Sequence, residues 1–301
     1  MKILLIGSSG QLGKEIIKSS PKNINLLTPN RTFLDLSRPK ECINFIKNIS
    51  PDWVINSGAY TNVDKAESDT ENALKVNAKG PEAIAKAISL TGGKLLHIST
   101  DYVFDGKQNT PYKSSQKISP INFYGFSKGE GESLIQNLLP ANNQLCIIRT
   151  SWLMSPFGNN FATKMIKLIG DRKEIKVVYD QVSSPTTVAS LANVIWKTIE
   201  LNNEYTKTKR IFPKINHFSN SGIASWYDVA VALGDIGIKT GLIRKAANII
   251  PIESDEYPTE ALRPKYSVLD SSQIIKITNI NNYHWREALF NTFENFRSQN
   301  I

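Results

Sequence analysis

The opening stretch Met1-Lys-Ile-Leu-Leu-Ile-Gly7-Ser-Ser-Gly10-Gln-Leu-Gly13 decides the fold. An apolar run typical of a buried β-strand passes directly into three glycines that are separated by two residues each. A segment with helical spacing of its apolar residues follows at 11–19. Glycines at such a strand-to-helix turn let backbone N–H groups approach a dinucleotide pyrophosphate, which the helix N-terminus also attracts. The stretch therefore predicts a nucleotide-binding turn at the start of an α/β domain.

The rest of the first half repeats this alternation of strand and helix. Runs rich in Ile, Leu and Val predict strands at 2–6, 24–28, 53–56, 94–98 and 145–149. Apolar residues spaced three and four apart predict helices at 11–19, 39–48, 69–90 and about 126–138. Because these strands are apolar throughout, they are expected to be buried on both faces, as in a parallel sheet with right-handed crossovers. We expect an α/β fold with a Rossmann-type doubly wound parallel sheet.

After about residue 150 the alternation becomes looser. Helices are predicted at 159–169, 187–200, 225–234 and 284–297, and further strands at 175–178 and 215–218. No Gly/Ser-rich linker separates the two halves. We therefore expect an NAD(P)-binding domain at 1–155 and a smaller C-terminal substrate lobe at 156–301, which packs on the first and can exchange segments with it.

Composition excludes several classes of function. The 301 residues carry 36 Lys+Arg against 27 Asp+Glu, but the excess lysine is scattered, and the dense cluster Lys207 to Arg210 is expected in a surface loop. We therefore expect no nucleic-acid binding. Cys42 and Cys146 are too few for a disulfide framework, and three histidines without an acidic cluster predict no metal site. No apolar run approaches the roughly 20 residues that cross a bilayer, so we expect a cytoplasmic protein without membrane contact.

Tyr124, Lys128 and Thr100 form the candidate catalytic group. Tyr124 and Lys128 stand four residues apart, so they share one face of a helix, and Thr100 closes the fourth predicted strand, where open α/β sheets bind ligands. A phenol can donate a proton to a ketone that is being reduced, and a nearby ammonium lowers the pKa of that phenol from about 10. The Thr100 hydroxyl can orient the same carbonyl. These residues predict hydride transfer to a ketone.

The loop after the second predicted strand indicates which nicotinamide cofactor is used. The usual acidic residue at the end of this strand is absent, and Arg31 stands close to its place. Because an arginine can accommodate a 2′-phosphate, NADPH is favoured, with NADH as the alternative.

Further blocks of sequence accompany these motifs. They are Val54–Glu67, Ser99–Gly106, Arg149–Trp152, Asp180–Thr186, Ser225–Trp226 and Arg263–Asp270. Together with the glycine turn and the Tyr124/Lys128 pair, they resemble the dTDP-4-dehydrorhamnose reductase family, within the extended short-chain dehydrogenase/reductase superfamily. The resemblance runs from residue 3 to about residue 270.

The resemblance implies a reaction and a set of contacts. The reaction is NADPH-dependent reduction of the C4 ketone of dTDP-4-dehydro-L-rhamnose, the last step of dTDP-L-rhamnose synthesis for cell-surface polysaccharide. Implied cofactor contacts are Gly10, Gln11 and Leu12 at the pyrophosphate, Asp35 and Leu36 at the adenine, and Ala59, Tyr60 and Thr61 beside the middle of the cofactor. Gly7, Gly13, Arg31, Tyr124 and Lys128 complete the expected cofactor contacts. Thr100, Asp101 and Trp152 are implied at the nucleotide sugar, and Arg263 at its diphosphate.

Departures from the family pattern leave alternatives open. Gly129 and Gly131 weaken the helix after the reactive lysine, by roughly 1 kcal/mol each relative to alanine. Glu15 matches one ligand of a metal that some members carry between subunits, but the stretch 186–191 directly after Pro185 holds no carboxylate for a second ligand, so we expect no metal and leave monomer or homodimer open. Trp226 is expected to pack rather than to bind a ligand.

Two rival functions remain. One is a non-catalytic NADP-binding regulatory subunit of the methionine adenosyltransferase type, which resembles this family without needing reductase chemistry. The other is a reductase or epimerase of another nucleotide sugar. His97 is expected to be a core histidine in the fourth strand rather than an acid catalyst.

Overall fold

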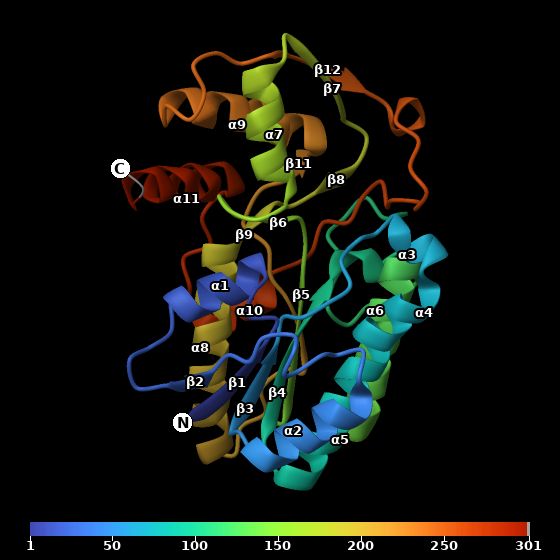
Figure 1. Ribbon diagram of the computed structural model, residues 1–301, viewed down its shortest axis with the longest axis vertical. Helices are drawn as coiled ribbons and strands as arrows, with labels where there is room; N and C mark the ends of the chain where they lie inside the picture. Colours follow the sequence, from blue (N-terminus) through green and yellow to red (C-terminus); the bar gives the residue numbers. More distant parts are fainter. Residues whose placement is uncertain (300–301) are drawn as a thin grey trace.

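A parallel sheet forms the centre of the molecule, which a computed structural model describes for residues 1–299 (Figure 1). Its strand order is β10-β5-β4-β3-β1-β2. The strands are β1 (Lys2–Ile6), β2 (Asn25–Leu27), β3 (Trp53–Asn56), β4 (Lys94–Thr100), β5 (Leu145–Thr150) and β10 (Ile215–His217). Because β2 and β3 lie on opposite sides of β1, the order reverses there, and this is where doubly wound sheets bind ligands. The predicted α/β, Rossmann-type fold is confirmed.

Helices cover both faces of this sheet (Figure 1). One face carries α1 (Gln11–Lys18), α8 (Val188–Lys207) and α10 (Ser272–Thr278), and the other carries α2 (Pro39–Ile49), α5 (Gly80–Thr91) and α6 (Phe123–Leu138). Alternate residues of β1 enter opposite cores, with Ile3 and Leu5 in one and Leu4 and Ile6 in the other. All four are 3% exposed or less, as expected for a strand that is apolar on both faces.

The helix expected at 69–90 is divided, which corrects that prediction. The structure has α3 (Lys65–Ser68), α4 (Thr70–Leu74), the π-helical turn η1 (Lys75–Lys79) and then α5. The π turn carries Asn77, whose buried amide bonds the backbone N–H and C=O of Tyr60 at 2.8 and 3.0 Å and Ser127 Oγ at 3.0 Å. The irregular turn thus holds the loop after β3 against α6, a use of π turns that recurs at functional sites.

Two other boundaries differ from expectation. Helix α6 begins at Phe123 because Asn122 caps it, accepting a 2.8 Å hydrogen bond from the Gly125 N–H. Tyr124 therefore lies in the first turn of α6. Helix α8 continues to Lys207, so the first residue of the basic cluster is helical and the rest of the cluster, up to Arg210, lies in the loop that follows.

The second lobe packs helices against short strands. Its helices are α7 (Phe161–Asp171), α9 (Trp226–Lys239) and α11 (Trp285–Gln299). Its strands are β6 (Leu153–Met154), β7 (Glu174–Val178), β8 (Val182–Ser183), β9 (Thr186–Thr187), β11 (Ala224–Ser225) and β12 (Asn248–Ile252). Strand β12 was not expected, and it pairs in parallel with β7 although it contains Pro251. A proline is tolerated there because the strand is paired on one side.

Segments from beyond residue 155 complete the core of the sheet. Leu191 and Ile195 of α8, Phe218 after β10 and Ile274 of α10 share a buried cluster with Ile3 of β1. Residue 155 therefore does not mark an end of the sheet's core. Within residues 1–299, no helix has both the length and the hydrophobicity that crossing a bilayer requires.

Candidate active site

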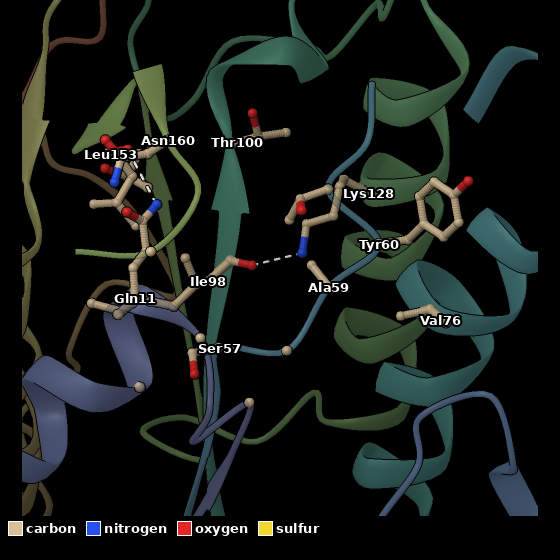
Figure 2. A pocket seen from close by; sticks show the side chains of 18 of the residues that line it. Gln11, Ser57, Ala59, Tyr60, Val76, Ile98, Thr100, Lys128, Leu153 and Asn160 are labelled. Atoms are coloured by element: carbon tan, nitrogen blue, oxygen red, sulfur yellow. Dashed lines mark hydrogen bonds between the residues drawn. The ribbon is translucent and has the colours of Figure 1, made fainter. Parts of the chain in front are cut away.

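A cavity of about 750 Å³ opens at the carboxyl ends of the strands and extends to the second lobe. The glycine turn after β1, the loops after β2 and β3, the end of β4 and the start of α6 line it. Residues after β5 and Trp226 of α9 line its other side. Figure 2 shows residues of this lining, with Lys128 reaching toward β4 and Gln11 toward the segment after β5. The volume is in the range of cofactor sites.

The glycine turn fits a dinucleotide pyrophosphate. Gly7 adopts φ +84°, in the left-handed region that glycine tolerates, and a Cβ on Gly13 would lie 2.2 Å from the Gly7 carbonyl oxygen. The start of α1 therefore packs against the turn after β1 more closely than a larger residue at position 13 would allow. Gly10 is the N-cap residue of α1, and within residues 1–299 no side-chain hydrogen bond caps this helix. Its first N–H groups can therefore bind an anion.

Gln11 lines the cavity but uses its side chain elsewhere. Its Nε2 donates to the Leu153 carbonyl at 3.2 Å (Figure 2), and its Oε1 accepts a bond from Ser155 Oγ at 3.0 Å. The amide thus ties the glycine turn to the segment after β5. The backbone N–H of Gln11, at the start of α1, is available for the expected pyrophosphate contact, which stays a prediction.

Arg31, Asp35 and Leu36 line the far end of the cavity, where the adenine is expected. The exposed Arg31 side chain places Nε 3.1 Å from Asp35 Oδ2. Burial would raise the pKa of Asp35, but hydrogen bonds from Ser37 and Arg31 outweigh it and lower this pKa. Asp35 is therefore a carboxylate that holds Arg31 at the mouth of the cavity.

Ala59, Tyr60 and Thr61 lie along the middle of the cavity, in the loop after β3. The Tyr60 ring points away from Lys128 (Figure 2), and its hydroxyl donates to Asp69 Oδ2 at 3.0 Å. Since Asn77 holds both backbone groups of Tyr60, this loop is rigidly placed for close approach by a ligand.

Thr100 and Tyr124 meet at the end of β4. The Thr100 hydroxyl donates to Asp101 Oδ1 at 3.0 Å and accepts from the Tyr102 N–H at 3.1 Å, and it lies close enough to the Tyr124 phenol to act on the pKa of that phenol. Burial raises the pKa of Tyr124 to about 12; the Thr100 hydroxyl acts against this rise and the Asp101 charge adds to it. The phenol is thus protonated at neutral pH, as a proton donor must be.

Lys128 lies one helical turn after Tyr124 and is 2% exposed. Its Nζ donates to the Ile98 carbonyl at 2.7 Å (Figure 2) and lies 3.2 Å from His97 Nε2. Burial lowers the pKa of Lys128 to about 8, against the opposing charge of Glu132. The expectation that Lys128 lowers the pKa of Tyr124 is therefore wrong here, because burial of the phenol dominates.

Asp101 is a buried carboxylate whose oxygens are already engaged. It accepts hydrogen bonds from Thr100 in the first lobe and from Ser183 and Ser267 in the second. Burial raises the pKa of Asp101 to about 6, although these hydroxyl bonds act to lower it. Asp101 lines the cavity and orients Thr100; its expected contact with a nucleotide sugar stays a prediction.

Aromatic rings form the wall of the cavity on the second-lobe side. Trp152 stacks on Trp226 with ring centroids 3.5 Å apart and planes 11° from parallel, and Phe161 packs on Trp226 at 4.5 Å. Trp152 holds φ 44°, an uncommon conformation for a bulky residue. Trp226 thus lines the cavity, which goes beyond the expectation that it only packs, and Phe161 is a cavity residue that no local sequence pattern marks. Ser225 caps α9 as expected, but nothing local indicates that the helix start faces a cavity.

Arg263 lies outside the cavity lining. Its guanidinium forms a bidentate ion pair with Asp64, with Nη1–Oδ1 and Nη2–Oδ2 distances of 3.0 and 2.8 Å. The hydrogen bond from Arg263 is the main cause that lowers the pKa of Asp64. The expected contact of Arg263 with a diphosphate therefore stays a prediction, and the structure assigns this side chain a different partner.

The chain matches the family model described as RmlD substrate binding domain over residues 1–298. It is similar to a dTDP-4-dehydrorhamnose reductase of Aggregatibacter actinomycetemcomitans, with 34% identity over 292 residues that cover 96% of this chain and 97% of that protein. Among solved structures it is similar to a dTDP-4-dehydrorhamnose reductase of Clostridium acetobutylicum, with a TM-score of 0.88, 36% identity and coverage of 99% of this chain and 100% of that one. The Bacillus anthracis dTDP-4-dehydrorhamnose reductase in complex with NADP has a TM-score of 0.87, 34% identity and coverage of 97% and 98%.

Proposed function

This chain belongs to the RmlD substrate binding domain family, and from that membership we propose that it is an NADPH-dependent dTDP-4-dehydrorhamnose reductase. It reduces the C4 ketone of dTDP-4-dehydro-L-rhamnose to the hydroxyl of dTDP-L-rhamnose, the last step in making this sugar donor for cell-surface polysaccharide. The observation that carries the proposal is the meeting of Thr100, Tyr124 and Lys128 in one cavity with the glycine turn.

The residues of the cavity divide the work of the reduction. NADPH, when bound, supplies the hydride that becomes the hydrogen on C4. Thr100 orients the carbonyl oxygen, and Tyr124 donates its phenolic proton to that oxygen, so one hydride and one proton together convert the ketone to an alcohol. Because the pKa of Tyr124 is raised to about 12 by burial, the phenol holds this proton over the physiological pH range.

Lys128 supports the same step from one turn along α6. After proton transfer the phenol carries a negative charge in a buried site, which is costly unless a cation or a new proton reaches it. With a pKa of about 8, lowered by burial, Nζ can hold a proton at neutral pH and release it. Lys128 thus returns the proton that Tyr124 gives up.

The cofactor is held along the length of the cavity. The glycine turn and the start of α1 take the pyrophosphate, and the loop of Ala59, Tyr60 and Thr61 takes the middle. Arg31 lines the end of the cavity beyond this loop and can supply the cation that a 2′-phosphate needs, which favours NADPH over NADH. The similarity to the NADP complex from Bacillus anthracis supports this choice. The cytoplasmic location and the monomeric or homodimeric state stay predictions.

The proposal is tested by following NADPH oxidation with enzymatically prepared dTDP-4-dehydro-L-rhamnose. Tyr124→Phe removes the proton donor and is expected to lower kcat by about 10²–10⁴-fold, while NADPH binding, measured by fluorescence, stays within about threefold because the ring remains. Tyr179→Phe is the matched control, since its hydroxyl bonds Glu253 away from the cavity.

Two outcomes contradict the proposal in different ways. A wild-type protein that binds NADPH but oxidises none with this substrate would reject the reductase assignment and favour the non-catalytic or altered-substrate alternatives. Full activity of Tyr124→Phe would keep the reaction and reject Tyr124 as the proton donor.

A further inference from the structure

Asn56, His97 and Lys128 form a buried chain of hydrogen bonds that runs from β3 across β4 to α6. Their exposed fractions are 1%, 0% and 2%. Asn56 Nδ2 lies 3.0 Å from His97 Nδ1, and His97 Nε2 lies 3.2 Å from Lys128 Nζ. Because the three side chains are shut off from solvent, the direction of each hydrogen bond is set by the protein.

Gly58 decides the direction of the first bond. Its backbone N–H donates to Asn56 Oδ1 at 3.2 Å, so the Nδ2 group of the amide faces His97. An amide nitrogen only donates, and His97 Nδ1 must therefore accept. Burial, with the neighbouring Lys128 charge, lowers the pKa of His97 well below its usual range. A neutral imidazole whose Nδ1 accepts carries its single proton on Nε2.

The Nε2 proton of His97 points at Lys128. An ammonium has donors only, so it opposes this N–H at 3.2 Å, whereas an uncharged amine offers a lone pair and accepts it. Nζ can do so while one of its own N–H groups bonds the Ile98 carbonyl. We propose that His97, with its tautomer set by Asn56, is a positioning residue that donates a hydrogen bond to Lys128 Nζ and favours the amine over the ammonium.

The other charged groups near Lys128 either favour its ammonium form or do not act on Lys128 directly. Glu132, one turn further along α6, favours the ammonium, but Arg149 of β5 holds its carboxylate at 2.6 Å and shares its charge. Tyr124 lies one turn earlier and is uncharged at neutral pH, and Asp101 acts on that phenol rather than on Lys128. Among these neighbours, His97 is therefore the one that favours release of a proton from Lys128 Nζ.

The consequence for the reaction rests on the function proposed above. Lys128 returns a proton from Nζ to the Tyr124 oxygen after reduction: the Nζ–H bond breaks and the phenolic O–H bond forms. A hydrogen bond that stabilises the resulting amine makes this return easier. His97 thus tunes the proton supply without touching substrate or cofactor.

The tautomer can be read by NMR in the free protein, without substrate. The chain has three histidines, so the imidazole ¹⁵N spectrum contains three rings, and His97→Gln identifies one of them. We expect a neutral ring with its proton on Nε2 from pH 6 to pH 9. A proton on Nδ1, or a ring that charges in this range, would overturn the proposal.

The effect on Lys128 is measured by titrating the protein with ¹³C-labelled lysine ε-carbons, with Lys128→Met to identify the resonance. Asn56→Asp keeps an acceptor for the Gly58 N–H and adds one for Nδ1–H, so the proton of His97 should move to Nδ1 and Nε2 should accept from the ammonium. We expect the Lys128 midpoint to rise by about one pH unit or more in Asn56→Asp, and also to rise in His97→Gln.

The control is His284→Gln, which alters an exposed histidine outside the site and should leave the midpoint unchanged. Unchanged midpoints in both test variants, with the fold retained, would reject the role of His97. The NMR measurements do not depend on turnover, so they test the role of His97 separately from the proposed reductase function. Inactivity toward the nucleotide sugar with an Nε2 proton and shifted midpoints would reject the proposed function alone.

Discussion

At the scale of single residues, burial moves the acid–base groups of the site toward their uncharged forms. It raises the pKa of Tyr124 to about 12 and of Asp101 to about 6, and it lowers the pKa of Lys128 to about 8. The common cause is loss of water around the charged form, which hydrogen bonds only partly replace. The pKa values of Asp101 and Lys128 therefore lie close to neutral pH, where both groups can exchange protons.

Asp101 should leave a signature in the pH dependence of stability. Its pKa is about 6 in the folded protein, raised by burial from 3.8, so the folded state binds the proton more tightly, and stability falls as pH rises through this window. Asp101→Asn removes the titration. Its free energy of unfolding relative to wild type should therefore rise by about 2–3 kcal/mol from pH 4 to pH 7, measured by urea unfolding.

Asp105→Asn is the control of opposite sign. A hydrogen bond from Tyr112 lowers the pKa of Asp105, so this residue stabilises the fold above its unfolded pKa and loses that contribution as pH falls. Its variant should approach wild type in stability toward low pH. A constant difference between Asp101→Asn and wild type would show that Asp101 is not buried as described.

At the scale of elements, close contact with neighbouring backbone explains why α6 contains several glycines. A Cβ on Gly125 would lie 2.0 Å from the Tyr102 carbonyl oxygen, and one on Gly131 would lie 2.1 Å from the Asn77 carbonyl oxygen. Both are backbone atoms that cannot swing aside. Helix α6, which carries Tyr124 and Lys128, thus packs directly against η2 (Asp101–Val103) and η1. Its glycines allow this contact, although glycine is less favourable than alanine inside a helix.

Gly129 and Gly131, two residues apart, offer a matched pair of variants. Gly131→Ala is expected to lower the free energy of unfolding by about 1–3 kcal/mol, since the helix must move away from η1. Gly129→Ala meets the flexible end of Ile118 instead and gains about 1 kcal/mol of helix propensity, so its stability should be equal to or above wild type. Equal losses in urea unfolding would contradict this account of α6.

At the scale of the whole molecule, a few long-range contacts hold the second lobe over the sheet. Arg263 reaches Asp64 in the loop after β3, and the Ala261 N–H also donates to this carboxylate at 3.2 Å. Asn122, the cap of α6, donates to the Leu262 carbonyl at 2.8 Å. The chain around residue 262 is thereby fixed to the start of the catalytic helix.

A double-mutant cycle tests whether Arg263 works as this link. Asp64→Ala and Arg263→Ala should each destabilise the fold, and the double variant should be less destabilised than their sum by about 1 kcal/mol, because the pair is partly buried. The exposed pair Asp235–Arg286 should show coupling near zero in the same assay. Additive effects at Asp64 and Arg263 would contradict the link. Weaker nucleotide-sugar binding in Arg263→Ala alone would support the diphosphate contact instead.

The sequence by itself determined what depends on neighbouring residues. The apolar runs of β1, β3, β4 and β5, the glycine turn and the spacing of Tyr124 and Lys128 are local patterns, and the structure has each of them as expected. A strand buried on both faces is apolar along most of its length, and a helix brings residues four apart onto one face, so these inferences need no knowledge of the fold.

Tertiary structure alone decided where distant segments meet. It made the π turn at Asn77, brought β10 beside β5, turned Trp226 toward the cavity, paired Arg263 with Asp64, and placed the Asn56 amide against His97. Each of these depends on a contact between residues many positions apart. The free energy of such a contact comes from packing and lost solvation in the folded state, which no local pattern of residues records.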